Sequence, residues 1–264
     1  MQVASVHADV VVVRSAFWQT NCTIVHRGAK DGKGECFVID SPVLPNELEA
    51  LPLVVAQTGW EPSALLCTHG DWDHVLGRLA FPDKALGCAE TTGARFRAVP
   101  GEAQRELREF DEEHYVERPR PLSLGQLQTL PVPGRLDIGD AELELLPADG
   151  HTEDGMAIRV PWADVVICGD YLSPVEIPWL SERGSRDAYL ATLERLRPWV
   201  EEATWVVPGH GTPLDGPRAL AILREDVAYL QALPDPKAKL PLARQTAAQR
   251  TIHAENLRRM GAPE

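Results

Sequence analysis

The stretch Cys67–Gly77, CTHGDWDHVLG, brings four side chains of metal-binding type into six residues of chain. It overlaps a short apolar run, 64–68 (ALLCT), that predicts a buried strand. The four side chains belong to His69, Asp71, Asp73 and His74. Positions 69 and 71 face the same way in extended chain, whereas positions 73 and 74 turn toward a neighbouring point, where a helix is expected to begin. One loop can therefore supply two metal positions.

The charge balance limits the classes of partner. The 264-residue chain has a formal net charge of −13, which argues against nucleic acid because phosphate recognition usually needs a basic face. The N-terminal MQVASVHADVVVVRS lacks the basic start of a signal peptide, and no apolar run approaches the roughly 18 residues that span a membrane. We expect a cytoplasmic protein with a small-molecule substrate and no membrane partner.

The five cysteines, at positions 22, 36, 67, 88 and 168, are odd in number, widely spaced and without a CxxC pair. In a chain of this size, that pattern predicts reduced and mostly buried thiols, which is typical of a cytosolic protein.

Strands and helices alternate along most of the chain, which predicts an α/β protein. Apolar runs predict strands at 10–13, 21–26, 36–40 (CFVID), 64–68, 136–138, 142–146, 156–160, 165–168 and 204–207. Apolar residues at helical spacing predict helices at 46–58, 101–115, 187–197, 218–233 and 244–260. The proline-rich segment 116–133 is expected to be a loop.

We divide the chain into a domain at 1–233 and a helical extension at 234–264, because the composition changes there. The extension carries six basic and three acidic residues in an otherwise acidic chain. Three roles stay open for its helix: a solvated or self-packing terminus, a contact in a homodimer, or a clamp on an anionic substrate.

Three further segments repeat the pattern of a histidine or aspartate beside glycine at the end of a predicted strand. Together with THGDWDH (68–74), they are DGHT (149–152), CGDY (168–171) and PGHG (208–211). Glycine lets the backbone turn tightly and direct the neighbouring side chain inward. Sites in α/β proteins lie at strand ends, so the four segments predict one shared site.

In this order, the segments resemble the metallo-β-lactamase superfamily. The shared pattern is HxDxDHxxG at 69–77, GHT at 150–152, GD at 169–170 and GHG at 209–211, within a resemblance that spans roughly residues 10–215. The resemblance implies a four-layer αββα sandwich with a binuclear metal site at one edge of its two sheets. It also implies a hydroxide that bridges two metal ions.

The resemblance assigns a role to each ligand residue. The first ion would be bound by His69, Asp71 and His151, and the second by Asp73, His74 and His210. Asp170 would bridge the ions, and Asp73 would also orient the hydroxide and accept a proton. Two ions about 3.5–4 Å apart can hold both the attacking and the leaving oxygen of a hydrolysis.

Asp71 departs from the superfamily, whose usual pattern is HxHxDH. A carboxylate here is similar to the glutamate of flavodiiron proteins, but this chain offers no flavodoxin domain. Two divalent ions, the usual two aspartates and a hydroxide leave a charge of about +1, which Asp71 lowers to about zero. Because carboxylate-rich sites suit iron or manganese better than zinc, we hypothesise Fe, Mn or mixed Fe/Zn rather than zinc alone.

Three other interpretations of this departure stay open. The carboxylate of Asp71 can simply replace histidine on zinc. It can point away and leave one metal position weak or empty. The whole site can also be vestigial, in a binding module without catalysis, although every other ligand is present.

A hydroxide between metal ions attacks carbonyl carbon or phosphorus. The expected activity is hydrolysis of a small ester, thioester or lactone. An iron-dependent redox enzyme similar to persulfide dioxygenases is the alternative from another class. A phosphodiesterase is the alternative within the superfamily. Fold and metal site together do not choose among these reactions.

Substrate contacts are expected from aromatic residues and from the extension. Superfamily lactonases use a tyrosine near the bridging aspartate as an oxyanion donor, and Tyr171 adjoins Asp170, although not at the usual position. Trp18, Trp72 and Trp179 are candidates for an apolar pocket, with buried packing as the alternative for each. Glyoxalase II-like thioesterases bind glutathione with basic residues of a C-terminal extension, and the basic extension here allows a similar site.

Overall fold

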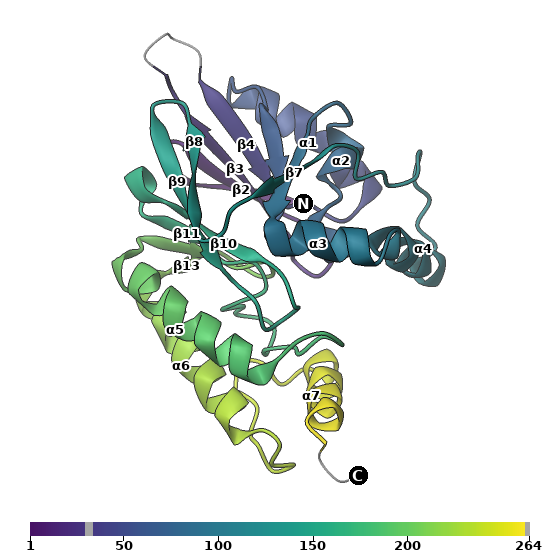
Figure 1. Ribbon diagram of the computed structural model, residues 1–264, viewed down its shortest axis with the longest axis vertical. Helices are drawn as coiled ribbons and strands as arrows, with labels where there is room; N and C mark the ends of the chain where they lie inside the picture. Colours follow the sequence, from purple (N-terminus) through teal and green to yellow (C-terminus); the bar gives the residue numbers. More distant parts are fainter. Residues whose placement is uncertain (30–33, 262–264) are drawn as a thin grey trace.

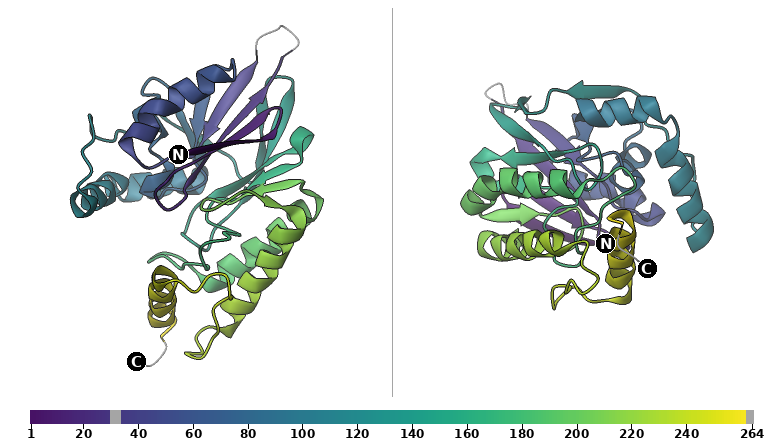
Figure 2. Two further views of the ribbon diagram at one scale, coloured as in Figure 1. Left: turned by 180° about the vertical axis from the view of Figure 1, so that it is seen from behind. Right: turned by 60° about the horizontal axis from the view of Figure 1, so that its bottom comes forward.

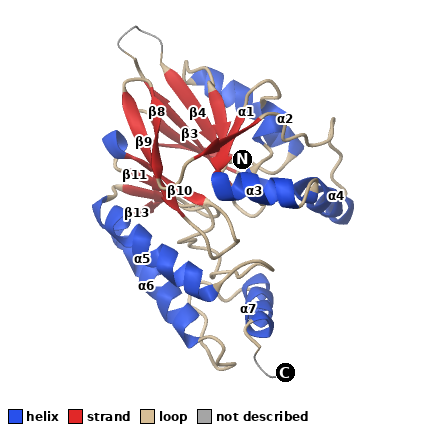
Figure 3. Ribbon diagram, viewed as in Figure 1, coloured by secondary structure: helices blue, strands red, loops and turns tan. Residues whose placement is uncertain are grey.

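The computed structural model describes residues 1–29 and 34–261. Its strands form two sheets that face each other, and helices cover the outer face of each sheet (Figure 1). Figure 3 shows the strands gathered between two groups of helices. Within these residues we find no helix with both the length and the apolar character needed to cross a membrane.

The first sheet provides the strand that leads into the first ligand segment. Among the described residues it has seven strands, in the order β1-β2-β3-β4-β5-β6-β7, with antiparallel pairing from β1 to β4 and parallel pairing from β4 to β7. The strands are β1 (Gln2–His7), β2 (Val10–Arg14), β3 (Asn21–Arg27), β4 (Glu35–Ile39), β5 (Ala64–Leu66), β6 (Leu86–Ala89) and β7 (Leu127–Leu130). Parallel pairing places the carboxyl ends of β4 and β5 side by side.

The second sheet provides the other three ligand segments, which follow β9, β11 and β12. Its order in the described part of the chain is β13-β12-β11-β10-β9-β8, and only β11 and β12 pair in parallel there. The strands are β8 (Gly134–Ile138), β9 (Ala141–Pro147), β10 (Met156–Val160), β11 (Val165–Ile167), β12 (Trp205–Val207) and β13 (Leu214–Asp215).

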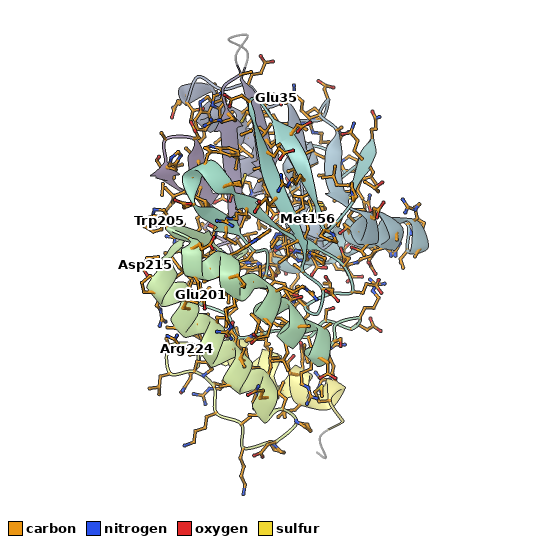
Figure 4. All side chains as sticks on the ribbon, turned by 60° about the vertical axis from the view of Figure 1, so that its left-hand side comes forward. Glu35, Met156, Glu201, Trp205, Asp215 and Arg224 are labelled. Carbon is orange, nitrogen blue, oxygen red and sulfur yellow. The ribbon has the colours of Figure 1, made fainter. Side chains whose placement is uncertain are left out.

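Helices cover both sheets. The helices of the first half are α1 (Pro45–Gln57), α2 (Gly77–Ala80), α3 (Glu90–Ala98) and α4 (Glu102–His114), and short 3₁₀ turns occur at Trp72–His74 and Pro161–Ala163. Against the second sheet lie α5 (Arg186–Glu202) and α6 (Gly216–Ala232), which run side by side in Figure 2 and in Figure 4, where Glu201 and Arg224 are labelled. The last helix, α7 (Ala247–Arg259), lies near the C-terminus (Figure 1) and contacts α6, because His253 and Asn256 each lie 3.0 Å from the hydroxyl of Tyr229.

Strand β2 shows why the fold has four layers. Val10 and Val12 belong to the cluster between the two sheets, whereas Val11 and Val13 belong to the cluster between the first sheet and its helices. Successive side chains point to opposite faces of a strand, so the run VVVV needs cover on both sides. A third cluster packs the second sheet against α5 and α6. These three cores confirm the predicted αββα sandwich.

Several segments differ from the sequence prediction, among them β1 and β13, for which no strand is predicted. The loop predicted at 116–133 contains β7, whose LQTL sequence has no apolar face and becomes a strand by parallel pairing with β6. The segment 81–100, for which no element is predicted, holds β6 and α3. The helix expected at Asp73 or His74 is a single 3₁₀ turn, followed by the short α2.

The cysteines match the prediction. All five lie within the described residues, where they are buried and free of disulfides. Burial raises the pKa of Cys22 and of Cys168, so these thiols stay protonated.

Candidate metal centre

The four ligand segments meet at one centre. Its ligand atoms form three groups, and the atoms of each group lie within 4.8 Å of one another. The groups are His69–Asp71–His151, Asp73–His74–His210 and His69–His74–Asp170. The structure therefore brings together all seven residues that the sequence predicts as ligands.

The first candidate metal position lies between one aspartate and two histidines. Oδ2 of Asp71 is 3.6 Å from Nε2 of His69 and 3.4 Å from Nε2 of His151. Both imidazoles are buried. The Asp71 carboxylate thus points into the centre, against the interpretation in which it points away. Burial would raise the pKa of Asp71, but the facing imidazoles of His151 and His69 hold it well below its usual value.

The second position has the same composition. Oδ2 of Asp73 lies 3.6 Å from Nε2 of His74 and 3.5 Å from Nε2 of His210. All three side chains are buried. Each position therefore pairs one carboxylate with two imidazoles.

Asp170 lies between the two positions. Its Oδ2 is 3.4 Å from Nε2 of His151 and 3.3 Å from Nε2 of His210, and its Oδ1 is 3.2 Å from Nε2 of His74. A Cβ atom at Gly209 would collide with Oδ1 of Asp170, so only glycine leaves room for this carboxylate. These distances place Asp170 close to imidazoles of both groups.

Hydrogen bonds on the outer side of two imidazoles, those of His151 and His210, set their tautomers. Nδ1 of His151 faces the carbonyl oxygen of Trp179 at 2.9 Å, and Nδ1 of His210 faces that of Trp18 at 3.1 Å. A carbonyl oxygen only accepts, so both Nδ1 atoms carry hydrogen, and in the neutral rings both Nε2 atoms turn a lone pair toward the centre. Outer hydrogen bonds of this kind orient metal-binding histidines.

The inner atoms lack partners of their own. Among the described residues, the buried atoms without a hydrogen bond include Nε2 of His69, His74 and His151 and Oδ1 of Asp170. Buried polar groups are otherwise almost always paired, because an unpaired one costs about 1–3 kcal/mol. Several of them aimed at one point are the donor set that a metal ion satisfies, and nitrogen and carboxylate oxygen ligands fit zinc, iron or manganese.

Proton binding by the metal-free centre follows from its charges. Burial lowers the pKa of His210 and of His151, but Asp170 raises the pKa of His210 to about 10, and Asp71 and Asp170 raise that of His151 to about 9. In the absence of an ion, protons therefore balance the carboxylates.

A family model described as the metallo-beta-lactamase superfamily matches residues 16–210, which include every residue of this centre. This chain belongs to the metallo-β-lactamase superfamily. Solved structures agree on the fold. A metallo-beta-lactamase from Pontibacter korlensis superimposes with a TM-score of 0.61 at 16% identity, covering 87% of this chain and 98% of that one. The protein TTHA1623 in a di-iron-bound form gives 0.59 at 22% identity, covering 79% and 96%.

Curated relatives come from the same superfamily. A hydroxyacylglutathione hydrolase of Cereibacter sphaeroides (strain ATCC 17029 / ATH 2.4.9) is 29% identical over 199 residues, which are 75% of this chain and 66% of the relative. One from Ruegeria pomeroyi is 27% identical over 179 residues, 67% of this chain and 58% of the relative. The matched regions thus span less than two thirds of these relatives' lengths.

Asp40 is a supporting residue that the sequence analysis missed. It directly follows β4 with a positive φ of 58°, and its carboxylate accepts hydrogen bonds from the backbone and hydroxyl of Thr68 at 2.7 and 2.9 Å. Its Oδ2 also lies 3.0 Å from Nδ1 of His74. The carboxylate thus ties β4 to the superfamily's first ligand segment. Its signal in the sequence is an aspartate at the end of the strand CFVID.

Arg95 is a second missed residue. It lies on α3 and is only 6% exposed, and its Nη1 is 2.7 Å from Oδ1 of Asp71 and 3.0 Å from Oδ1 of Asp154. The charge count from the sequence omits this cation, so the negative charge that Asp71 adds to a superfamily centre is in part offset. Nothing in the sequence near position 71 signals Arg95, because α3 is not predicted.

Tyr171 lies beside the centre, where its hydroxyl bonds the backbone of the predicted ligand His151. The side chain is buried, and its hydroxyl accepts a hydrogen bond from the backbone N–H of His151 at 3.2 Å. Burial raises the pKa of this phenol. The oxyanion role that the sequence analysis takes from superfamily lactonases gains no support from this position.

The three predicted pocket tryptophans occupy two places. Trp18 and Trp72 have ring centroids 5.6 Å apart and both contact Phe110, and Trp18 is 46% exposed whereas Trp72 is buried. Trp179 is half-buried, with its ring centroid 5.3 Å from that of His151. All three therefore lie on segments that also hold ligands or their hydrogen-bond partners.

The C-terminal helix contacts the loop that carries Trp179. Asn256 on α7 accepts a hydrogen bond from the backbone N–H of Leu180 at 2.9 Å and donates one to the carbonyl oxygen of Pro178 at 2.7 Å. Nε1 of Trp179 donates to Glu255 at 3.1 Å. The helix thus reaches the first metal position through one loop.

Proposed function

We propose that this superfamily member is a binuclear metallo-hydrolase that acts on a small ester, thioester or lactone, with a thioester as the first class to test. The observation that carries this proposal is the pair of positions, each with two imidazoles and one carboxylate, on either side of Asp170. The relatives named hydroxyacylglutathione hydrolase support a thioester within this class.

The donor set suits two ions of zinc, iron or manganese. When bound, two such ions lower the pKa of water and polarise a carbonyl oxygen. His69, Asp71 and His151 would hold an ion at the first position, and Asp73, His74 and His210 would hold one at the second, with Asp170 available to both.

Asp73 is the group that we assign to proton transfer. The residue is 6% exposed, and its carboxylate is bordered by the imidazoles of His74 and His210. A carboxylate held in this way can orient the attacking water and accept its proton, which is general base catalysis. The exposed ring of Trp18, beside Trp72, offers apolar surface to the acyl group of the substrate.

The test is metal content followed by a substrate panel. Protein from metal-balanced medium is analysed for zinc, iron and manganese, and the loaded enzyme is then assayed with thioesters, lactones, aryl esters and phosphodiesters. We expect about two ions per chain and the highest kcat/KM on a carbonyl substrate. Iron or manganese in the purified protein supports the hypothesis that the centre takes these metals rather than zinc alone. Stoichiometric zinc without either metal contradicts that hypothesis.

Asp73→Asn tests the proton-transfer role, and the metal content of the same variant is measured to correct for any loss of metal. We expect kcat per metal-loaded enzyme to fall by about 10²–10⁴-fold, because the general base is lost. Glu153→Gln, at an exposed side chain near the same centre, is the matched control with unchanged kcat. Oxygen consumption with glutathione persulfide, without hydrolysis of any panel substrate, would instead assign the redox alternative, and metal-free purified protein would assign a binding module.

A further inference from the structure

We propose that Arg95 is a positioning residue that enables Asp71 to serve as a ligand at the first metal position, where the superfamily usually has histidine. This inference rests on the proposed metal centre. It concerns how two ligand segments are held together and which of the two positions depends on that contact.

Arg95 contacts only one of the two oxygens of the Asp71 carboxylate, so the other oxygen faces the first metal position. Nη1 of Arg95 is 2.7 Å from Oδ1, while Oδ2 lies 3.4 Å from Nε2 of His151 and 3.6 Å from that of His69. An aspartate can otherwise rotate or bind an ion with both oxygens. The charge-assisted hydrogen bond of a guanidinium holds one oxygen outward and leaves one for the ion.

The same guanidinium joins the two segments that make the first position. Its Nη1 also lies 3.0 Å from Oδ1 of Asp154, which follows the ligand His151 by three residues. Oδ2 of Asp154 in turn accepts a hydrogen bond from the backbone N–H of Gly70 at 2.9 Å, beside the ligand His69. Arg95 and Asp154 therefore bridge the segments 68–74 and 149–155.

Charge explains why the bridge is an arginine. The side chains of Asp154 and Asp71 are 0% and 17% exposed, so two carboxylates lie close together with little water. Burying charge without a partner is strongly unfavourable, and Arg95 contacts both carboxylates in the part of the chain that the structure describes. Glu102 binds Nε of Arg95 at 3.0 Å, and Arg183 in turn contacts Glu102 at 2.5 Å. The network fixes the orientation of Arg95 without depending on an ion.

The second position has a different support. Nδ1 of His74 faces Asp40, and Nδ1 of His210 faces the carbonyl oxygen of Trp18. Arg95 contacts no residue of that position in the described hydrogen bonds and ion pairs. Loss of Arg95 should therefore weaken the first position selectively.

The experiment titrates apoprotein with Zn²⁺ against a chromophoric chelator, with Co²⁺ absorption as a second readout. In Arg95→Gln, we expect one of two sites to weaken by about 10–100-fold, as is typical when the partner of a metal ligand is removed. His151→Ala and His210→Ala identify which site is which. Arg183→Gln is the matched control, because it disturbs the same network without touching Asp71, and its two affinities should stay at wild-type values.

Two further variants keep the test decisive. Arg95→Gln with Asp154→Asn removes the stranded buried carboxylate, so it should fold and still show the weak first site. In a background that carries Asp71→His and Asp154→Asn, neither carboxylate needs the guanidinium, so adding Arg95→Gln should change zinc affinity little. Equal weakening of both sites, unchanged sites, or the same loss in that background would overturn the proposal. A wild-type protein that binds two ions but hydrolyses no substrate would refute the proposed function alone.

Discussion

The carbonyl oxygen of Trp179 and Nδ1 of His151 are 2.9 Å apart, and this hydrogen bond links the C-terminal helix to the metal centre. Asn256 on α7 binds both neighbours of Trp179, and Glu255 binds its indole. A segment more than 40 residues beyond the family match at 16–210 thus helps to set the direction of a ligand. The extension is part of the site's support, whatever contact it makes with substrate.

Asn256→Ala should weaken the first metal position. The variant leaves the N–H of Leu180 and the carbonyl of Pro178 without hydrogen-bond partners in a buried site, which costs about 1–3 kcal/mol of unfolding free energy. It also frees the loop that holds the carbonyl oxygen of Trp179, the hydrogen-bond acceptor of His151. We expect Zn²⁺ affinity at that position to fall by up to about 10-fold, measured by chelator competition. Thr251→Ala, at an exposed position of the same helix, should bind as wild type does. Full retention of both affinities in Asn256→Ala would show that α7 does not position His151.

Arg244→Met should destabilise the protein in a pH-dependent way. Arg244 is 1% exposed and its Nη1 is 2.6 Å from Oδ1 of the equally buried Asp226. Removing one partner of a buried ion pair costs about 3–5 kcal/mol of unfolding free energy. Urea denaturation at a series of pH values measures this loss.

The direction of the pH effect follows from Asp226. Burial raises its pKa to about 7 even beside Arg244, and a raised carboxyl pKa gives stability that is lost as pH rises toward and past that value. Without the arginine, the loss should therefore be larger at about pH 8 than at about pH 5. The double variant Arg244→Met with Asp226→Leu should recover most of the stability, because no buried charge remains. A loss that is the same at all pH values would contradict this account.

Metal binding should strengthen as the pH rises. In the metal-free protein the pKa of His151 is raised to about 9 and that of His210 to about 10, so both imidazoles are protonated near neutral pH. An ion must displace these protons, and affinity increases until the pH passes the raised values. Calorimetry in buffers of different ionisation enthalpy should show proton release on Zn²⁺ binding. His253→Gln, outside the centre, should release as many protons, and binding without proton release would refute the prediction.

Asp170→Asn should weaken both positions together. The amide keeps the size of the side chain but removes the charge that lies between His151 and His210. We expect the affinity for each of two Zn²⁺ ions to fall by about 100-fold or more, seen as metal content after dialysis. The control is Asp137→Asn on an exposed face of β8, which should retain both ions. Loss of one ion only would show that Asp170 serves a single position.

Much of the fold could be predicted from local sequence patterns. Apolar runs such as VVVV in β2 predict strands buried on both faces, and the structure places alternate valines in two different cores. Strand β7 was not accessible in this way. Its LQTL sequence has no alternation, and it exists because β6 offers it an edge to pair with.

The candidate centre likewise has features that the sequence predicts and features that it does not. The sequence by itself determined which side chains are available as ligands, because His69, Asp71, Asp73 and His74 lie within one loop and glycines mark the other three segments. It did not determine how Asp71 is used. That depends on Arg95, which is 24 residues away on a helix that local pattern does not predict.

Only the tertiary structure decided the surroundings of each ligand. Asp40, Arg95 and Trp179 contact the ligands from β4, α3 and a loop before α5, and the last is held by α7. Ligand type and spacing are local properties that a short stretch of chain encodes. Charge compensation and imidazole orientation come from residues distant in the chain, which meet only when the two sheets and their helices pack together.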